Sequence, residues 1–451
     1  MKCRYGERVQ TSISSKYLDS SLGSGRQMDK SNIGGSIKSL VGWLFGPKYT
    51  GDAVFLLKSI RRLPYALLGR PKELCNLPFV SLRRAHHHIF FGYYDLCPFH
   101  QSDDRHLALS VQSSFGKRSS AVAEIGYFHA EEPERFLSHG LTSLWNWQMG
   151  CRLQWYPNAG NDAVFYNALV MGVPGGLVYD LGRGEVLQEL PLPIYEFSPD
   201  GRHGLSLDFF DLHKNRPGYG YRGGAWTSTP ETAIWGIDVD TGMYEELVSY
   251  KDIWNGDQED GSGSSSNYVN HLSYSPDGSH FLFLHIQQSA DLRNIRLFVA
   301  NSDGSNLRVV VESRLVSHYA WLGADHILCF SWLRGSGLGY YVYSLDDDSV
   351  CDFTCGSLTE DGHPGFFPDQ QALITDTYPD RLGERHLLKY DKRCGQITEL
   401  ASYYSPFHMR GELRCDLHPR LDRSGTRVSV DTGHAGLREI RILDLTNVNT
   451  A

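Results

Sequence analysis

The chain has 451 residues, 41% of them apolar, which is enough to bury a sizeable core and too many for a disordered chain. Its 43 basic and 52 acidic residues give a formal net charge of −9, without the basic footprint of a nucleic-acid-binding protein. No apolar run is long enough to predict a transmembrane helix.

The N-terminal part differs in composition from the rest of the chain. Residues 1–37 are rich in Ser, Gly and Lys and are expected to be disordered, whereas 38–77 are expected to form a short helical extension. Because apolar and basic residues alternate between 38 and 68, this extension either packs on the main domain or makes a weak contact with a membrane surface. The sequence shows no apolar export leader and its cysteines are scattered, so we expect a cytoplasmic protein.

From residue 78 to residue 451 the helical period gives way to short strand-like runs separated by turn residues. One turn, Ser-Pro-Asp-Gly, occurs twice without change, at 198–201 and at 275–278, and weaker versions recur elsewhere. Pro fixes the first turn dihedral and Asp-Gly tolerates a tight reversal, so each copy predicts a hairpin between two strands.

The turns divide this region into repeated units of four strands. Four strands per unit at this spacing are typical of a β-propeller, so the predicted fold is all-β, a seven-bladed β-propeller with four-stranded antiparallel blades. Residues 78–90 are expected to supply a strand that closes the ring. The blades are predicted at about 95–130, 146–190, 191–249, 268–312, 313–357, 358–401 and 413–447.

One position of the repeat, four residues before the turn, holds the candidate catalytic and metal-binding side chains. It holds Arg152 in the second blade and a histidine in each of the last four: His271, His318, His363 and His418. The innermost strands of a propeller line its central channel, so these side chains are expected to converge on one site at the rim. The alternative is that each histidine is structural and bonded to the neighbouring blade.

Three of the repeats resemble a known family. The runs Asn270–Gly278, Asp361–Gly365 and Asp416–Arg420 resemble the seven-bladed propeller lyases that cleave uronate polysaccharides, the oligogalacturonate and ulvan lyases, and also generic TolB-like propellers. The resemblance implies a divalent metal, Mn²⁺, Zn²⁺ or Ca²⁺, bound by His271, His363 and His418, and no organic cofactor.

The same resemblance implies β-elimination on a uronic-acid glycan. This chemistry needs a group that neutralises the carboxylate, a base, and a proton donor for the leaving oxygen. Arg152 or the metal is the expected neutralising group, His88 or His318 the base, and Tyr94 the donor. The alternative function is a non-catalytic propeller that binds glycan or serves as a scaffold in surface polysaccharide synthesis.

The expected partner is an oligosaccharide or polysaccharide. The aromatic insertion at 209–226 is expected to stack on sugar rings over the same face of the propeller. The predicted substrate-binding residues are Tyr219, Tyr221, Arg222, Trp226, Arg420 and His434.

Overall fold

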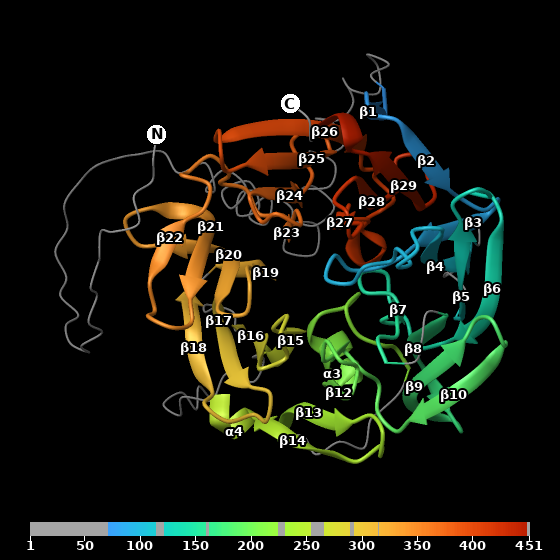
Figure 1. Ribbon diagram of the computed structural model, residues 1–451, viewed down its shortest axis with the longest axis horizontal. Coiled ribbons are helices and arrows are strands. Elements are labelled where there is room, and N and C mark those ends of the chain that lie inside the picture. The colour runs from blue at the N-terminus through green and yellow to red at the C-terminus, as the bar shows by residue number, and fades with distance from the viewer. Residues whose placement is uncertain are drawn as a thin grey trace, which may run out of the picture. The chain divides into compact units, whose positions relative to one another are not determined.

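The computed structural model describes residues 71–113, 121–158, 162–223, 231–253, 266–288, 293–313 and 315–448. From Lys72 onward the chain is one compact unit, in which strands form six antiparallel sheets of four strands and one of five. The sheets are the blades of a ring (Figure 1). The predicted seven-bladed β-propeller is therefore confirmed.

Each blade begins with its channel-lining strand and runs outward. The first three blades consist of β3 (His87–Phe90), β4 (Arg105–Gln112), β5 (Ala123–His129), β6 (Phe136–Thr142); β7 (Gln154–Trp155), β8 (Ala163–Val170), β9 (Val173–Asp180), β10 (Glu185–Leu190); and β11 (Glu196–Phe197), β12 (His203–Ser206), β13 (Thr232–Asp238), β14 (Tyr244–Ser249). The fourth and fifth consist of β15 (Ser266–Tyr274), β16 (His280–Gln288), β17 (Arg293–Asn301), β18 (Arg308–Ser313); and β19 (Val316–Trp321), β20 (His326–Leu333), β21 (Gly337–Ser344), β22 (Val350–Asp352).

The last two blades each include a strand from the N-terminal end of the propeller. The sixth consists of β23 (Gly365–Phe366), β24 (Ala372–Asp376), β25 (Glu384–Asp391), β26 (Gln396–Tyr404) and β1 (Glu73–Cys75), and the seventh of β27 (Arg420–Leu421), β28 (Arg427–Thr432), β29 (Glu439–Asp444) and β2 (Phe79–Leu82). The described helices are α3 (Phe209–Asn215), α4 (Tyr250–Ile253), η2 (Gly411–Leu413) and η3 (Thr446–Val448).

Strand β2 closes the ring, as predicted for residues 78–90, but the end of this segment, β3, is the channel-lining strand of the first blade, which therefore begins earlier than the predicted 95. Strand β2 pairs with β29 as the outermost strand of the last blade, with Phe79 opposite Leu443 (Figure 1). The helical extension predicted for 38–77 is wrong at residues 73–75, which form strand β1 and pair with β26. The disorder expected for 1–37 and the helices and membrane contact expected for 38–68 lie outside the described residues.

The repeated turns have the conformation that the sequence predicts. In both 198–201 and 275–278 the Gly amide donates to the Ser carbonyl over 2.8 Å, and the Ser hydroxyl donates to the Asp carboxylate over 2.6 Å. The glycines have φ of 71° and 75°, a region in which a Cβ is disfavoured. These turns fix where each channel-lining strand ends and so set the blade register.

The core lies between the blades, because each sheet has a neighbour on both faces. In β16 every residue from Phe281 to Ile286 is buried, and Phe283 stacks on Phe298 of β17 with ring centroids 5.1 Å apart. Burying one such side chain stabilises the fold by about 1.5–3 kcal/mol. Among the described helices, none has the length and apolar character needed to cross a membrane.

Candidate active site at the channel histidines

Four histidines gather around one tyrosine in the channel. The ring centroid of Tyr93 lies 5.1 Å from that of His271, 6.3 Å from His318, 5.8 Å from His363 and 4.8 Å from His418. The His318 and His363 rings are 4.1 Å apart, and those of His363 and His418 are 4.3 Å apart. The expected convergence of the four repeat positions is therefore present in the structure.

Local irregularities in the channel-lining strands turn these side chains inward. Arg152, His271 and His418 have left-handed backbone, with φ of 58°, 55° and 47°. A break in strand pairing falls at His271 in β15 and at His318 in β19. Left-handed backbone at non-glycine residues is costly and tends to occur where a side chain is held for function.

A buried carboxylate orients two of the histidines. Asp376, at the end of β24, accepts from both the backbone N–H and Nδ1 of His363 over 2.8 Å, and from the backbone N–H of His418 over 3.1 Å. Nδ1 of His418 lies 2.7 Å from the carbonyl oxygen of Gly92 and donates to it. With Nδ1–H donated in this way, the neutral form of each imidazole has its lone pair on Nε2. Both Nε2 atoms are buried without a hydrogen-bond partner among the described residues.

A second carboxylate lies close to these two imidazoles. His363, Asp416 and His418 offer ligand atoms that all lie within 4.8 Å of one another. Asp416 is held by Arg385 at 3.0 Å and by Arg414 at 2.6 Å. Two imidazole nitrogens with their other nitrogen anchored, plus a carboxylate, fit a divalent metal of the Mn²⁺ or Zn²⁺ kind better than Ca²⁺, which prefers all-oxygen sites.

The four imidazoles do not share one charge state. Burial lowers the pKa of His271, of His318 and of His418, and the neighbouring imidazoles lower each further. Burial also acts to lower the pKa of His363, but the Asp376 carboxylate outweighs it and raises the value above the usual range. In the protein without metal, His363 is therefore the preferred proton carrier and its three neighbours are neutral.

His318 has the arrangement of a general base. Its Nδ1 lies 3.1 Å from the carboxylate of Asp361, which also accepts from the hydroxyl of Ser317 over 2.8 Å. A neutral imidazole that donates Nδ1–H to a carboxylate presents its bare Nε2 to a substrate. No described residue forms a hydrogen bond with this Nε2. The predicted His318 is thus placed in the site.

Tyr93, and not the predicted Tyr94, presents its hydroxyl to the histidines. The Tyr93 hydroxyl lies 3.4 Å from Nε2 of His271, and burial raises the pKa of Tyr93, so the phenol keeps its proton. The Tyr94 hydroxyl donates to the Tyr319 carbonyl over 2.9 Å and accepts from the Tyr319 amide over 3.2 Å. Because the Tyr94 hydroxyl both donates to and accepts from the backbone of Tyr319, its predicted role as proton donor is wrong.

Two arginines and two tyrosines border the histidines. Tyr219 lies 6.1 Å from His271 between ring centroids, and its hydroxyl accepts from Arg414 over 3.1 Å. The Arg216 guanidinium lies 5.1 Å from the Tyr219 centroid, and the Tyr378 ring lies 6.0 Å from that of His363. The predicted Tyr219 is placed at the site, whereas both arginines were missed.

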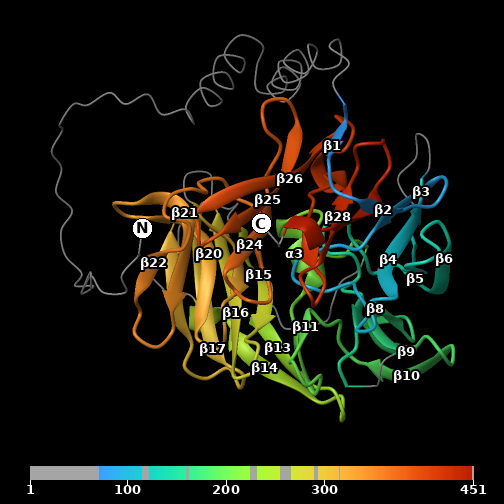
Figure 2. The same cartoon turned by 45° about the horizontal axis from the view of Figure 1, so that its top comes forward.

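Helix α3 positions Arg216. The Asp208 side chain caps its N-terminus by accepting from the amides of Phe210 and Asp211, and Phe209, Phe210 and Leu212 are buried. The helix packs against β15 inside the ring of blades (Figure 1 and Figure 2). Arg216 follows its last turn and is exposed, with no carboxylate of the described residues within ion-pair distance of its guanidinium.

Arg152 and His88 are structural in this fold. Arg152 is fully buried, pairs with Asp95 at 2.9 Å and donates to the Tyr195 carbonyl over 2.6 Å, so its charge is already neutralised. His88 packs edge-on against Trp147 at 5.1 Å, and its Nδ1 accepts from the backbone amide of Arg438 over 3.2 Å. Neither residue has the predicted catalytic geometry.

The two predicted tyrosines of the aromatic insertion, Tyr219 and Tyr221, are both buried. Tyr221 is 1% exposed, stacks on Phe209 at 4.5 Å, and its hydroxyl accepts from Asn167 over 2.7 Å. It is a core residue, and its assignment to sugar stacking is wrong. Trp226 lies outside the described residues.

Arg420 supports the loop that carries Tyr93. It is 3% exposed, pairs with Asp431 at 2.7 Å and donates to the Gly92 carbonyl over 3.1 Å. Its predicted role in binding substrate is therefore wrong, because Arg420 is buried and bonds to the backbone of Gly92.

The remaining two predicted substrate contacts lie in other ion-pair clusters. Arg222 is exposed and pairs with Glu412. His434 is buried beside Glu73 at 3.4 Å and Glu439 at 3.5 Å, on the side of the seventh blade that meets β1. No described contact joins His434 to the four channel histidines, which corrects its assignment.

One sequence signal would have found part of what was missed. Asp361 and Asp416 each stand two residues before a channel histidine, so the pattern Asp-x-His occurs in consecutive blades. A carboxylate at that spacing can reach the channel, as Asp361 does for His318 and Asp416 for the pair His363 and His418.

Comparison with known proteins supports the fold. No protein-family model and no curated protein matches the sequence. An oligogalacturonate lyase in complex with manganese has a TM-score of 0.59 at 15% identity, covering 85% of this chain and 100% of that chain. The oligogalacturonate lyase from Vibrio parahaemolyticus has a TM-score of 0.58 at 14% identity, with 83% and 98% covered. The structural agreement shows a shared propeller fold. Identities this low do not show the activity, which is argued from the site.

Proposed function

We propose that this propeller is a lyase that cleaves uronic-acid-containing oligosaccharides by β-elimination at the channel histidines. The observation that carries the proposal is the neutral, Asp361-oriented His318 within the same cluster as the protonated phenol of Tyr93. A base and an acid on one site are what elimination requires. The fold likeness to the oligogalacturonate lyases adds to this argument.

In the proposed reaction, Nε2 of His318 removes the proton on the carbon beside the uronate carboxylate. The electron pair of that C–H bond forms the new carbon–carbon double bond, and the bond from the adjacent carbon to the glycosidic oxygen breaks. Tyr93 is the proposed donor of the proton that this oxygen takes up. The products are an unsaturated uronate and a shortened sugar, and no water is consumed.

Arg216 indicates the substrate class. Arg216 is an exposed residue, and its guanidinium lies beside Tyr219 without an ion-pair partner among the described residues, whereas Arg414 is paired with Asp416. A guanidinium binds a carboxylate through two parallel hydrogen bonds, and the half-buried ring of Tyr378 lies beside the histidines. We therefore propose that Arg216 binds the carboxylate of the sugar.

We also propose a divalent metal at His363, Asp416 and His418. Nitrogen donors favour Mn²⁺ or Zn²⁺, and the manganese bound by the similar lyase is consistent with this choice. When bound, the metal would act as a Lewis acid that stabilises negative charge on the substrate carboxylate. His271 is not placed in this ligand set, because its Nε2 faces the hydroxyl of Tyr93.

The experiment is a turnover assay on uronate oligosaccharides, followed by the ultraviolet absorbance of the unsaturated product. The protein is assayed as purified, after chelation, and after addition of Mn²⁺, with neutral oligosaccharides as the substrate control. The proposal expects product only from uronates and dependence on the metal. Saturable binding of a uronate without any product would instead favour a glycan-binding module.

A further inference from the structure

His271 differs from the other three channel histidines in its exposure. His318, His363 and His418 are 4%, 1% and 1% exposed, whereas His271 is a half-buried residue. Its backbone is left-handed, with φ of 55°, and the Tyr319 hydroxyl donates to its carbonyl oxygen, so its position in the channel is fixed. Of the four, His271 is therefore the residue with the most surface open to a bound molecule.

The two ring nitrogens of His271 have different surroundings. Nε2 lies 3.4 Å from the hydroxyl of Tyr93, and the two rings are stacked with an interplanar angle of 21°. Nδ1 forms no hydrogen bond with the described residues, and it is not an enclosed atom like Nε2 of His363 and Nε2 of His418. Nδ1 of His271 therefore retains accessible surface, while Nε2 faces a buried phenol.

The phenol of Tyr93 determines which nitrogen of His271 carries the proton. Tyr93 is 2% exposed, and among the described residues its hydroxyl has Nε2 of His271 as its hydrogen-bond partner. A buried O–H group without an acceptor is costly, so the hydroxyl donates to Nε2. The neutral imidazole then carries its own proton on Nδ1, the nitrogen that a bound molecule can reach.

Tyr219 adjoins both His271 and Arg216. Its ring centroid lies 6.1 Å from that of His271 and 5.1 Å from the Arg216 guanidinium. Among the described residues, no other channel histidine has a ring contact with Tyr219. A sugar whose carboxylate pairs with Arg216 therefore enters the site on the His271 side.

We propose that His271 passes the proton of the buried Tyr93 to the leaving glycosidic oxygen, an inference that rests on the proposed function. The Nδ1–H bond of His271 breaks as the new O–H bond of the sugar forms, and the O–H bond of Tyr93 breaks as an Nε2–H bond forms. The imidazole stays neutral and changes tautomer, and the negative charge ends on the Tyr93 oxygen. After product release, water supplies a proton to Nδ1, Nε2 returns its proton to Tyr93, and His318 gives to water the proton that it removed.

The test compares two leaving groups at the same carbon of the substrate. An oligouronate releases an oxygen that needs a proton, whereas a uronate with fluorine at that carbon releases fluoride, which leaves as an anion. The amide of His271→Gln can still accept from the Tyr93 hydroxyl but does not pass a proton on. We expect this variant to lower kcat on the oligouronate by about 10²–10⁴-fold and to change kcat on the fluorinated substrate little.

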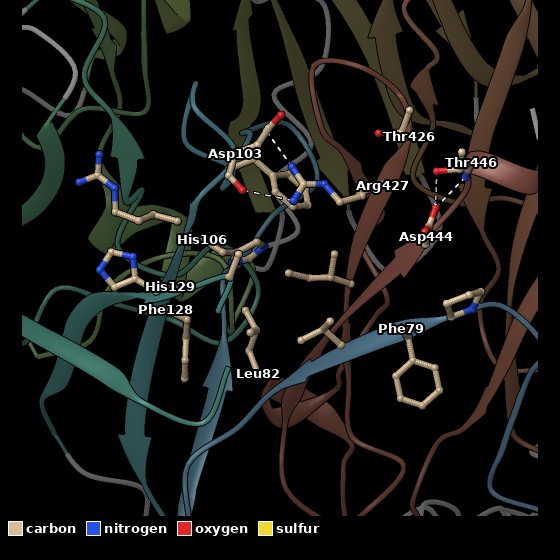
Figure 3. Close-up of a pocket in the computed structure, with 16 residues that line it drawn as sticks. Phe79, Leu82, Asp103, His106, Phe128, His129, Thr426, Arg427, Asp444 and Thr446 are labelled. Carbon is tan, nitrogen blue, oxygen red and sulfur yellow. Dashed lines mark hydrogen bonds and ion pairs between the residues drawn. The ribbon is translucent and has the colours of Figure 1, made fainter. Parts of the chain in front are cut away.

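Two further variants separate a relay from a structural role. Tyr93→Phe should show the same dependence on the leaving group, and it carries the test if His271→Gln does not fold in urea unfolding. The double variant should lose no more than the larger single loss, because both side chains act on one proton. His129→Gln is the control, since His129 ends β5 beside the cavity drawn in Figure 3 and should leave both rates unchanged.

The outcomes distinguish this relay from the reaction it serves. Equal losses on both substrates, additive losses in the double variant, or an unchanged kcat on the oligouronate would overturn the relay, while an active wild type would keep the proposed function. If the wild type forms no unsaturated product from either substrate, the proposed function fails and the relay fails with it.

Discussion

Replacing Asp376 by Asn should weaken metal binding while the metal ligands themselves stay in place. The carboxylate receives three hydrogen bonds, two on Oδ1 from His363 and one on Oδ2 from the backbone of His418. An amide has only one acceptor oxygen. If that oxygen keeps the two bonds to His363, the amide N–H₂ faces the N–H of His418, and a buried donor loses its acceptor.

The size of the effect follows from these contacts. An unsatisfied buried donor costs about 1–3 kcal/mol, and the lost charge weakens the two remaining bonds, so we expect the free energy of unfolding to fall by about 3 kcal/mol. Loss of the carboxylate that orients a ligating histidine typically costs 10–100-fold in metal affinity. Asp376→Asn should therefore bind Mn²⁺ about 10–100-fold more weakly.

The measurement is Mn²⁺ affinity by calorimetry together with urea unfolding. Asp361→Asn is the matched control, because it changes a carboxylate that pairs with His318, outside the proposed ligand set. This control should leave Mn²⁺ affinity essentially unchanged. Equal Mn²⁺ affinity in Asp376→Asn and the wild type would refute the proposed ligation by His363 and His418.

Three further predictions concern single side chains. His318→Gln should lower kcat on a uronate substrate by about 10²–10⁴-fold with an unchanged unfolding midpoint, and wild-type kcat would exclude it as the base. Arg216→Gln should raise KM about tenfold, whereas Arg222→Gln, whose arginine already pairs with Glu412, should not; equal effects would contradict carboxylate binding by Arg216. Burial lowers the pKa of His88 to about 4, so below pH 6.5 the unfolded chain binds a proton that the folded chain does not. Stability should therefore fall by up to about 3 kcal/mol between pH 6.5 and 4 in urea unfolding, and His88→Asn should lose less over the same range.

The fold and the convergence of the histidines were predictable because both depend on a repeat. The Ser-Pro-Asp-Gly turns at 198–201 and 275–278 fix where the channel strands end, and counting back from each turn gives the position that faces the channel. This arithmetic finds His271, His318, His363 and His418 without any knowledge of their contacts.

The rest of the site depends on segments that do not repeat. Tyr93 lies in a loop between β3 and β4, where the alternation of strand residues does not decide whether Tyr93 or its neighbour Tyr94 points at the histidines. Arg216 reaches the site because α3, an insertion in the third blade, packs inside the ring. The repeat also picks out Arg152, but its role was predicted wrongly. Its charge is neutralised by Asp95, which comes from a different blade and cannot be paired with it from the sequence.

The measurement that tests the proposed β-elimination most directly is the mass of the products formed from a uronate oligosaccharide in ¹⁸O-labelled water. Elimination consumes no water, so the two product masses should sum to that of the substrate, without label, and one product should carry a double bond. Product masses that sum to the substrate plus one labelled water would show hydrolysis and contradict the proposed reaction.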